Sequence, residues 1–270
     1  MIVSPLNYCG SKSEIVPEIL QVLPKEISVF VDAFGGAFNV GINVSAKKVI
    51  YNEFNPYVFE MVKWLTTVDR TKLVETVESI VESYGLKPCD VDAYKQLRVD
   101  YNKTHTTALL YCLTLYSFQH LLRYNNKHEF NMPVGNSGYN ESVRERLLNF
   151  VPSCEIEYLN KDYVDLDYDG FDQHTVFYFD PPYFTTVGDY NDGKRGMKGW
   201  SLTEEIEFHG VLEKLIQQGR PFVLSNVLDH NGKENTLLKE FINKHSLGIK
   251  ILGVHGRRYR KTEVLVSNLL

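Results

Sequence analysis

The sequence lacks the features that mark membrane, secreted and metal-binding proteins. No window contains 18 consecutive apolar residues, and the first residues, MIVSPLNYCGSKSEIV, lack the basic, apolar and small-residue order of a secretory signal. Four cysteines occur in 270 residues, widely spaced, with no C-x-x-C pair and no histidine grouped near them at metal-ligand spacing. We therefore expect a cytoplasmic protein with free thiols, no metal and no membrane partner.

An overall excess of basic residues is also lacking. The formal charge is −5 at pH 7, and this total by itself argues against a nucleic-acid partner. Two short segments differ from the rest. HGRRYRK (255–261) has four Lys or Arg and no acid, and GKRGMK (193–198) has three and none. These segments either form a basic face on an acidic protein or are solvated turns.

The hydrophobic pattern of the first 56 residues predicts a parallel α/β beginning. The apolar run 28–32 ends in an acid followed by a glycine pair, which indicates a buried strand and a turn. A helix-like stretch, AFNVGINV (37–44), follows, and KKVIYNEFN (47–55) indicates a second strand. Residues 57–150 instead have apolar residues at helical spacing and no strand signals. The predicted helices cover 58–65, 71–85, 91–104 and 106–122, before an irregular polar stretch, 123–140.

Strands and helices alternate again from residue 151. Ser201 and Glu204 have capping-box spacing, which predicts the start of a helix. The end of the chain, 250–269, indicates two strands around the basic turn. We predict one α/β domain of residues 1–56 and 151–270, interrupted by a helical subdomain of residues 57–150.

One candidate site is the end of the predicted strand 175–179. Asp180 is followed by Pro181, Pro182 and Tyr183. Prolines have no backbone N–H, so this extended turn offers acceptors without donors and suits a flat ligand with an NH2 group. Two acceptors holding an exocyclic amine would localise its lone pair for attack on an electrophile. The alternative is an ordinary strand-end turn with a solvated Asp180 and a tyrosine packed on the core.

A second candidate site is the turn at Gly35 and Gly36. It lacks the G-x-G-x-x-G spacing that holds a pyrophosphate at a helix N-terminus. S-adenosylmethionine carries no phosphate but has a sulfonium and an ammonium, so acids should line its pocket. Asp32 ends the first predicted strand and Glu53 the second, where a carboxylate can accept from ribose hydroxyls. Either these acids bind that cofactor or they are strand-end caps.

Several motifs occur together in one order along nearly the whole chain. They are NYCGSK, FVDAFGG, YNEFN, the Asn-rich loop after SFQHLLRYN, FDPPY and LSNVLDHNGKENTLLKEF. This set resembles the Dam-type DNA adenine-N6 methyltransferases and looks close to their phage branch. The resemblance implies a Rossmann-like mixed sheet with a C-terminal β-hairpin and an inserted helical target-recognition subdomain.

The resemblance also implies site residues. Asp180 and the Pro181 carbonyl would hold the target N6, and the Tyr183 ring would stack on the base. S-adenosylmethionine would bind in a pocket for which the candidates are Tyr8, Lys12, Asp32, Phe34, Gly36, Glu53, Asp162, Tyr163 and Asp180.

A base inside a duplex cannot reach such a pocket, so the resemblance implies base flipping. Phe118 matches a residue that wedges into the stack, Arg123 one that reads guanine, and Pro133 one that touches a thymine methyl. Asn125 lies in the same loop. The alternatives are core packing for Phe118 and a phosphate contact or plain surface for Arg123. The basic turn, with Arg257, Arg258, Arg260 and Lys261, would bind phosphates.

Two departures from the family bear on the target sequence. Asn7 stands where bacterial enzymes tend to have lysine, and Asn136 where they often have arginine. We expect GATC as the target, duplex DNA as the partner, a cognate restriction endonuclease acting on the same site, and a monomer or a dimer on DNA. Two other functions stay open: methylation of cytosine N4, RNA or a protein amide, and a non-catalytic DNA-binding module on a methyltransferase scaffold.

Overall fold

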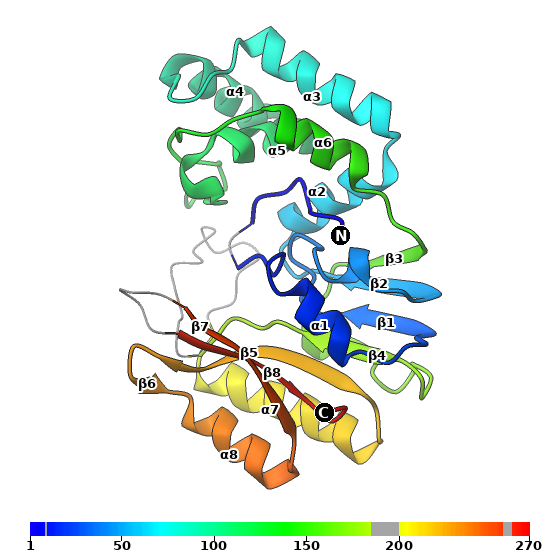
Figure 1. Ribbon diagram of the computed structural model, residues 1–270. Coiled ribbons are helices and arrows are strands. Elements are labelled where there is room, and N and C mark those ends of the chain that lie inside the picture. The colour runs from blue at the N-terminus through cyan, green and yellow to red at the C-terminus, as the bar shows by residue number, and fades with distance from the viewer. Residues whose placement is uncertain (9, 185–199, 256–260) are drawn as a thin grey trace.

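The computed structural model of the chain describes residues 1–8, 10–184, 200–255 and 261–270. Its strands form one sheet in the order β3-β2-β1-β4-β5-β8-β7, with β6 paired to β5 (Figure 1). Strands β1 to β5 pair in parallel, whereas β8 is antiparallel to both β5 and β7. The strands are β1 (Val29–Asp32), β2 (Lys48–Asn52), β3 (Glu155–Leu159), β4 (Val176–Phe179), β5 (Phe222–His230), β6 (Lys233–Glu234), β7 (Gly248–His255) and β8 (Lys261–Ser267).

Both faces of the sheet are covered, which explains the unbroken apolar runs of the central strands. In β4, Val176 and Tyr178 belong to one core cluster, and Phe177 and Phe179 belong to the other. The second cluster includes the apolar residues of α7 (Leu202–Gln217) and α8 (Thr236–His245), while the first includes those of α1 (Val16–Val22). The mixed sheet with its C-terminal antiparallel strands confirms the predicted Rossmann-like α/β class.

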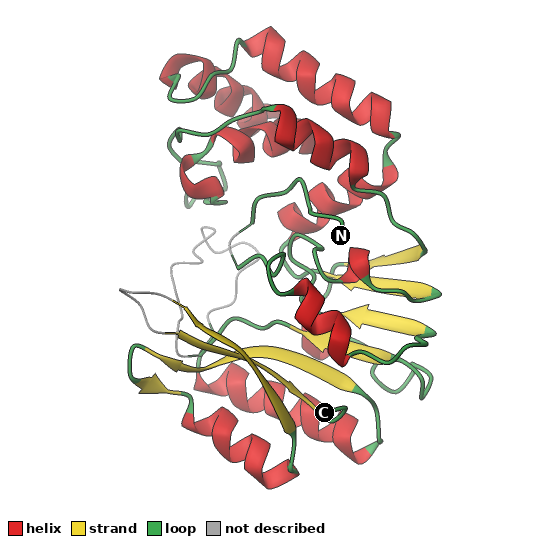
Figure 2. Cartoon of the chain, viewed as in Figure 1, coloured by secondary structure: helices red, strands yellow, loops and turns green. Residues whose placement is uncertain are grey.

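Five helices lie between β2 and β3 in the chain and gather at one end of the molecule (Figure 2). They are α2 (Pro56–Thr67), α3 (Arg70–Tyr84), α4 (Val91–Thr104), α5 (Thr107–Tyr116) and α6 (Glu141–Asn149). Arg70, the first residue of α3, links the last turn of α2 to the residue after α6. Its guanidinium donates to the carbonyl oxygen of Leu65 at 2.5 Å and to that of Phe150 at 2.9 Å.

Two predicted helices are wrong in part. Residues 37–44 form only a short 3-10 helix, η1 (Gly41–Asn43), because Gly36 and Phe38 have positive φ angles of 47° and 63°, which interrupt a helix. The helix predicted to reach residue 122 ends at Tyr116, and Gln119 and His120 have φ angles of 53° and 55°. Phe118 therefore begins a short, irregular 3-10 turn, η2 (Phe118–His120), instead of continuing α5.

Strand β3 was not predicted. It pairs only with β2, at the margin of the sheet, and its five residues are exposed or half-buried. A strand with so little burial has no continuous apolar run for a pattern to detect.

Among the helices of the described residues, none has the length and apolar content needed to cross a membrane.

Candidate active site

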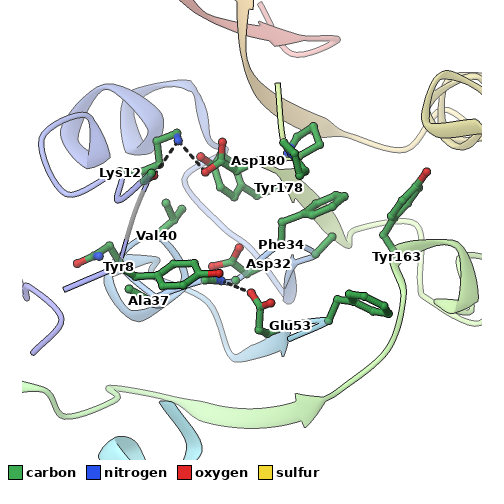
Figure 3. A pocket seen from close by; sticks show the side chains of 18 of the residues that line it. Tyr8, Lys12, Asp32, Phe34, Ala37, Val40, Glu53, Tyr163, Tyr178 and Asp180 are labelled. Atoms are coloured by element: carbon green, nitrogen blue, oxygen red, sulfur yellow. Dashed lines mark hydrogen bonds and ion pairs between the residues drawn. The ribbon is translucent and has the colours of Figure 1, made fainter. Parts of the chain in front are cut away.

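A cavity of about 180 Å³ lies at the carboxyl ends of the central strands. Chain order reverses here, because β1 is followed by β2 on one side whereas β4 is followed by β5 on the other. Ligands of open α/β sheets bind at such a switch point. The cavity is lined by every residue predicted for the cofactor, Tyr8, Lys12, Asp32, Phe34, Gly36, Glu53, Asp162, Tyr163 and Asp180, and also by Pro181 and Tyr183 (Figure 3).

Asp32, the last residue of β1, is a buried acid that faces this cavity. Its Oδ2 accepts a hydrogen bond of 3.0 Å from the backbone N–H of Gly41. Burial raises the pKa of the Asp32 carboxyl to about 7; the Gly41 N–H acts in the opposite direction, and the charges of Asp180 and Glu53 add to the rise. The charged form is thus poorly stabilised in the absence of a ligand.

Glu53 follows β2 and holds the glycine turn. Its two carboxylate oxygens accept from the N–H of Gly36 and from that of Asn55, both at 2.8 Å. Burial raises its pKa to about 7, and these two N–H groups oppose the rise. Glu53 therefore stabilises the backbone around it, which is the role expected of a strand-end cap. Each oxygen has a second lone pair, so capacity to accept from a ligand remains.

One side of the cavity is aromatic. The Phe34 ring centroid lies 5.2 Å from that of Tyr163 and 6.0 Å from that of Trp200. The Trp200 indole N–H donates to Glu205 Oε2 at 2.6 Å, which fixes the indole. Sequence reasoning missed Trp200, whose only signal is its place just before the capping box at Ser201. The aromatic side suits a flat ligand.

Asp180 lies at the other side, directly after β4. Its Oδ2 forms an ion pair of 2.7 Å with Lys12 Nζ, which also donates to the Gly10 carbonyl at 3.0 Å. The Tyr183 hydroxyl lies 3.1 Å from Asp180 Oδ1. Burial raises the pKa of Asp180, while the Lys12 ammonium opposes the rise. Pro181 is buried against the cavity and brings a carbonyl without an N–H.

The residues predicted to contact DNA gather beyond the end of α5. Phe118 is 49% exposed, so it is not a core residue, and its N–H donates to the Pro133 carbonyl at 2.9 Å. Arg123 is exposed, and its Nε donates to Asn131 Oδ1 at 2.8 Å. Asn125 accepts from two backbone N–H groups of its own loop through Oδ1, which gives it a structural role there. Arg257, Arg258 and Arg260 lie outside the described residues.

In the described part of the chain, no group of three or more His, Cys, Asp or Glu side chains is arranged to hold a metal ion. The thiols of Cys89, Cys112 and Cys154 are free.

Comparison with known proteins gives consistent matches. Residues 8–258 match the family described as D12 class N6 adenine-specific DNA methyltransferase. Modification methylase LlaI of Lactococcus lactis subsp. lactis is 44% identical over 98% of this chain and 43% of its own length. Modification methylase StsI of Streptococcus sanguinis is 39% identical over 99% of this chain and 43% of its own length. The chain therefore spans less than half the length of these relatives.

A shorter relative matches over most of its length. The DNA adenine methylase of Escherichia coli (strain K12) is 24% identical over 82% of this chain and 79% of its own. Among solved structures, wild-type Trm5b from Pyrococcus abyssi aligns with 97% of this chain and 50% of its own, at 11% identity. Its TM-score of 0.37 is too low to inform the site.

Proposed function

Because this chain belongs to the D12 class of N6 adenine-specific DNA methyltransferases, we propose that it transfers a methyl group from S-adenosylmethionine to N6 of an adenine in duplex DNA. The observation that carries the proposal is the donor-free turn beside the cavity. Asp180 and Pro181 supply a carboxylate and a carbonyl there, and neither proline of the turn can donate a backbone hydrogen bond. An amine with two hydrogens complements these two acceptors.

The buried acids and the aromatic rings of the cavity support S-adenosylmethionine as its ligand. Asp32 and Glu53 are buried acids that a cationic ligand with ribose hydroxyls would stabilise, and the rings of Phe34, Tyr163 and Trp200 give apolar contacts for its adenine. The bound cofactor supplies an electrophilic methyl group on a sulfonium. Tyr8 lies within 3.6 Å of the position that a Cβ would occupy at Gly36, so it covers the turn.

The residues of the turn prepare the nucleophile. The N6 lone pair of adenine is delocalised into the ring, which makes the amine a poor nucleophile. Asp180 and the Pro181 carbonyl, each accepting one N6 hydrogen, would draw the nitrogen towards tetrahedral geometry and localise that lone pair. The Tyr183 ring would hold the base by stacking. The acceptors are held by the protein before the substrate arrives, so little reorganisation accompanies the reaction.

We further propose that helices α2 to α6 form the target-recognition subdomain. Phe118 is exposed beside Pro133, and Arg123 lies in the next loop, so an aromatic wedge and a bidentate donor are close together. A wedge of this kind would occupy the stack after the adenine flips out. The basic turn would hold phosphates and position the duplex.

We also propose a target sequence and a cellular partner. Likeness to DNA adenine methylases supports GATC as the first sequence to test. The higher identities are with modification methylases, whose name implies a restriction endonuclease that acts on the same site. We expect such a partner here, and a monomer that acts on DNA. Expression in a host without adenine methylation, followed by sequencing of modified positions, identifies base and sequence context together.

Asp180→Ala tests the assignment of the site. The variant should lose at least two orders of magnitude in methyl transfer to DNA, because one of two preorganised acceptors is gone. Binding of S-adenosylmethionine and of DNA should remain measurable by calorimetry and fluorescence anisotropy. Asp92→Ala, at an exposed acid of α4, is the matched control and should methylate at the wild-type rate. Full activity of Asp180→Ala would refute the role of this carboxylate.

A further inference from the structure

A buried acid outside the recognised motifs lies beside the Tyr183 hydroxyl. Glu263 of β8 is 7% exposed, and its Oε1 lies 3.2 Å from that hydroxyl. On the other side of the same hydroxyl, Asp180 Oδ1 lies at 3.1 Å. Two carboxylates therefore face one O–H group.

The strand geometry brings Glu263 to this position. Its partners in the sheet are Val227 of β5 and Gly253 of β7, and the pairing register shifts next to each of them. Such irregularities re-aim side chains next to active sites. Leu265, two residues further on, belongs to the same core cluster as Tyr178, so Glu263 lies on the sheet face that carries the site.

The two carboxylates have matching surroundings. Asp180 uses Oδ2 to pair with Lys12 at 2.7 Å, and Glu263 uses Oε2 to pair with Lys261 at 3.2 Å. Each acid thus has one oxygen paired with a lysine and its other oxygen directed at Tyr183. The two ammonium groups lie 5.2 and 5.0 Å from the centroid of the Tyr183 ring.

A tyrosine hydroxyl has a single proton to donate, so it can serve only one of the two acids at a time. Burial raises the pKa of Tyr183 well above its ordinary value, so the proton is retained at neutral pH. When the hydroxyl donates to Asp180, it uses acceptor capacity on Oδ1. When it donates to Glu263, both lone pairs of Oδ1 remain available to the target amine.

We propose that Glu263 is a positioning residue that turns the Tyr183 hydroxyl away from Asp180, so that both lone pairs of Asp180 Oδ1 are available to the substrate NH2 group. This inference rests on the proposed function, since it assigns Asp180 the same amine. It gives the β7–β8 hairpin a part in catalysis, because its second strand supplies the acceptor that keeps the catalytic carboxylate available.

Removal of the acceptor and then of the donor tests the proposal. Glu263→Leu removes one of the two carboxylates that face the hydroxyl and keeps Asp180, and single-turnover methyl transfer should fall roughly tenfold, the rate equivalent of one hydrogen bond. Affinity for S-adenosylmethionine should stay unchanged. Tyr183→Phe keeps the ring and removes the proton, so the double variant Glu263→Leu/Tyr183→Phe should be faster than Glu263→Leu. Glu240→Leu, at an exposed acid of α8, is the matched control.

The outcomes separate this role from simpler ones. A purely structural Glu263 predicts that the two changes add, with the double variant slower than either. In Glu263→Leu, Lys261 loses its partner and could pair with Asp180 instead. In that case Lys261→Met, and not Tyr183→Phe, should restore the rate of methyl transfer. Either result, or a wild-type rate in Glu263→Leu, overturns the proposal.

A second measurement does not depend on activity. Titration of the Asp180 carboxyl carbon by NMR in the free protein should give nearly the same pKa in wild type and Tyr183→Phe. In the Glu263→Leu background the hydroxyl donates to Asp180 and stabilises its ionised form. Its removal by Tyr183→Phe should therefore raise the Asp180 pKa. Equal shifts in both backgrounds overturn the proposal. A wild-type protein that methylates no DNA contradicts the proposed function, while this titration still decides which acid accepts the hydroxyl.

Discussion

Asp32 and Glu53 are buried acids whose negative charge is not balanced within the described structure. Among the described residues, neither forms an ion pair, whereas Asp180 pairs with Lys12. Backbone N–H groups from Gly41, Gly36 and Asn55 are the partners that the two acids have. An unpaired buried charge is costly, so the free protein favours protonation of these acids and a cationic ligand favours their ionisation.

The pKa of Asp32 leads to a prediction about stability and pH. Its pKa in the folded protein is about 7 against an ordinary value of 3.8, so the folded state binds its proton more tightly. The stabilisation is fully present below about pH 4 and is lost as pH rises through about 7. The free energy of unfolding of wild type minus that of Asp32→Asn should therefore decrease from pH 4 to pH 7. Denaturant titration at each pH measures it.

Asp169 gives a control of opposite sign. It is exposed, and hydrogen bonds from Lys214 and Gln218 lower its pKa. The stabilisation that ionised Asp169 gives to the folded state should be present at neutral pH and lost as pH falls. A wild-type advantage over Asp32→Asn that grows from pH 4 to pH 7 would contradict the assignment of Asp32 as the acid held neutral by burial.

At the scale of elements, the end of α5 is the part that departs most from a regular helix. Gln119 and His120 both have positive φ, and the His120 ring Nδ1 lies 2.8 Å from the Thr114 carbonyl oxygen, which closes the turn back on the helix. A left-handed conformation at two successive non-glycine residues costs free energy and recurs at functional sites. The turn exposes Phe118 where a regular helix would have continued.

We predict that Phe118→Ala reduces base flipping and leaves the fold intact. A half-exposed ring contributes little to stability, so the free energy of unfolding should change by no more than about 0.5 kcal/mol. Fluorescence of 2-aminopurine at the target position should lose most of its flipping signal, and affinity for S-adenosylmethionine should stay the same. Val99→Ala, at an exposed apolar residue of α4, controls for lost surface area. A loss of several kcal/mol would instead indicate core packing.

Local sequence patterns predicted some of these elements and missed others. Strong local patterns succeeded: the acids at or directly after the ends of β1, β2 and β4 meet at one cavity, and Ser201 and Glu204 form the predicted capping box. The break after Tyr116 was missed because the apolar spacing of residues 117–122 continues that of a helix. Trp200 and Glu263 were missed because their partners are distant in the chain or set by sheet register, which no local spacing reveals.

At the scale of the whole molecule, an acidic protein is proposed to bind a polyanion. The net charge of −5 repels DNA at long range, so local basic residues must supply the attraction. The basic turn offers Arg257, Arg258 and Arg260 close together in the sequence.

Replacement of these three arginines by glutamine should weaken DNA binding equally for target and non-target sequences. Each phosphate contact contributes about 0.9 to the slope of log K against log salt, so the slope should become shallower by up to about 3. Fluorescence anisotropy across salt concentrations measures it. Loss confined to the target sequence would mean that the turn reads bases instead.

The Arg70 guanidinium, which joins the end of α2 to the residue after α6, bears on how such a chain diversifies. The last turn of α2 and the residue after α6 are held together by this one side chain. We therefore expect that the segment between residues 70 and 150 can be exchanged without unfolding the rest of the protein, as long as an arginine is kept at position 70. Chimaeras joined at these positions would test whether target preference, which we propose to lie in these helices, moves with the exchanged segment.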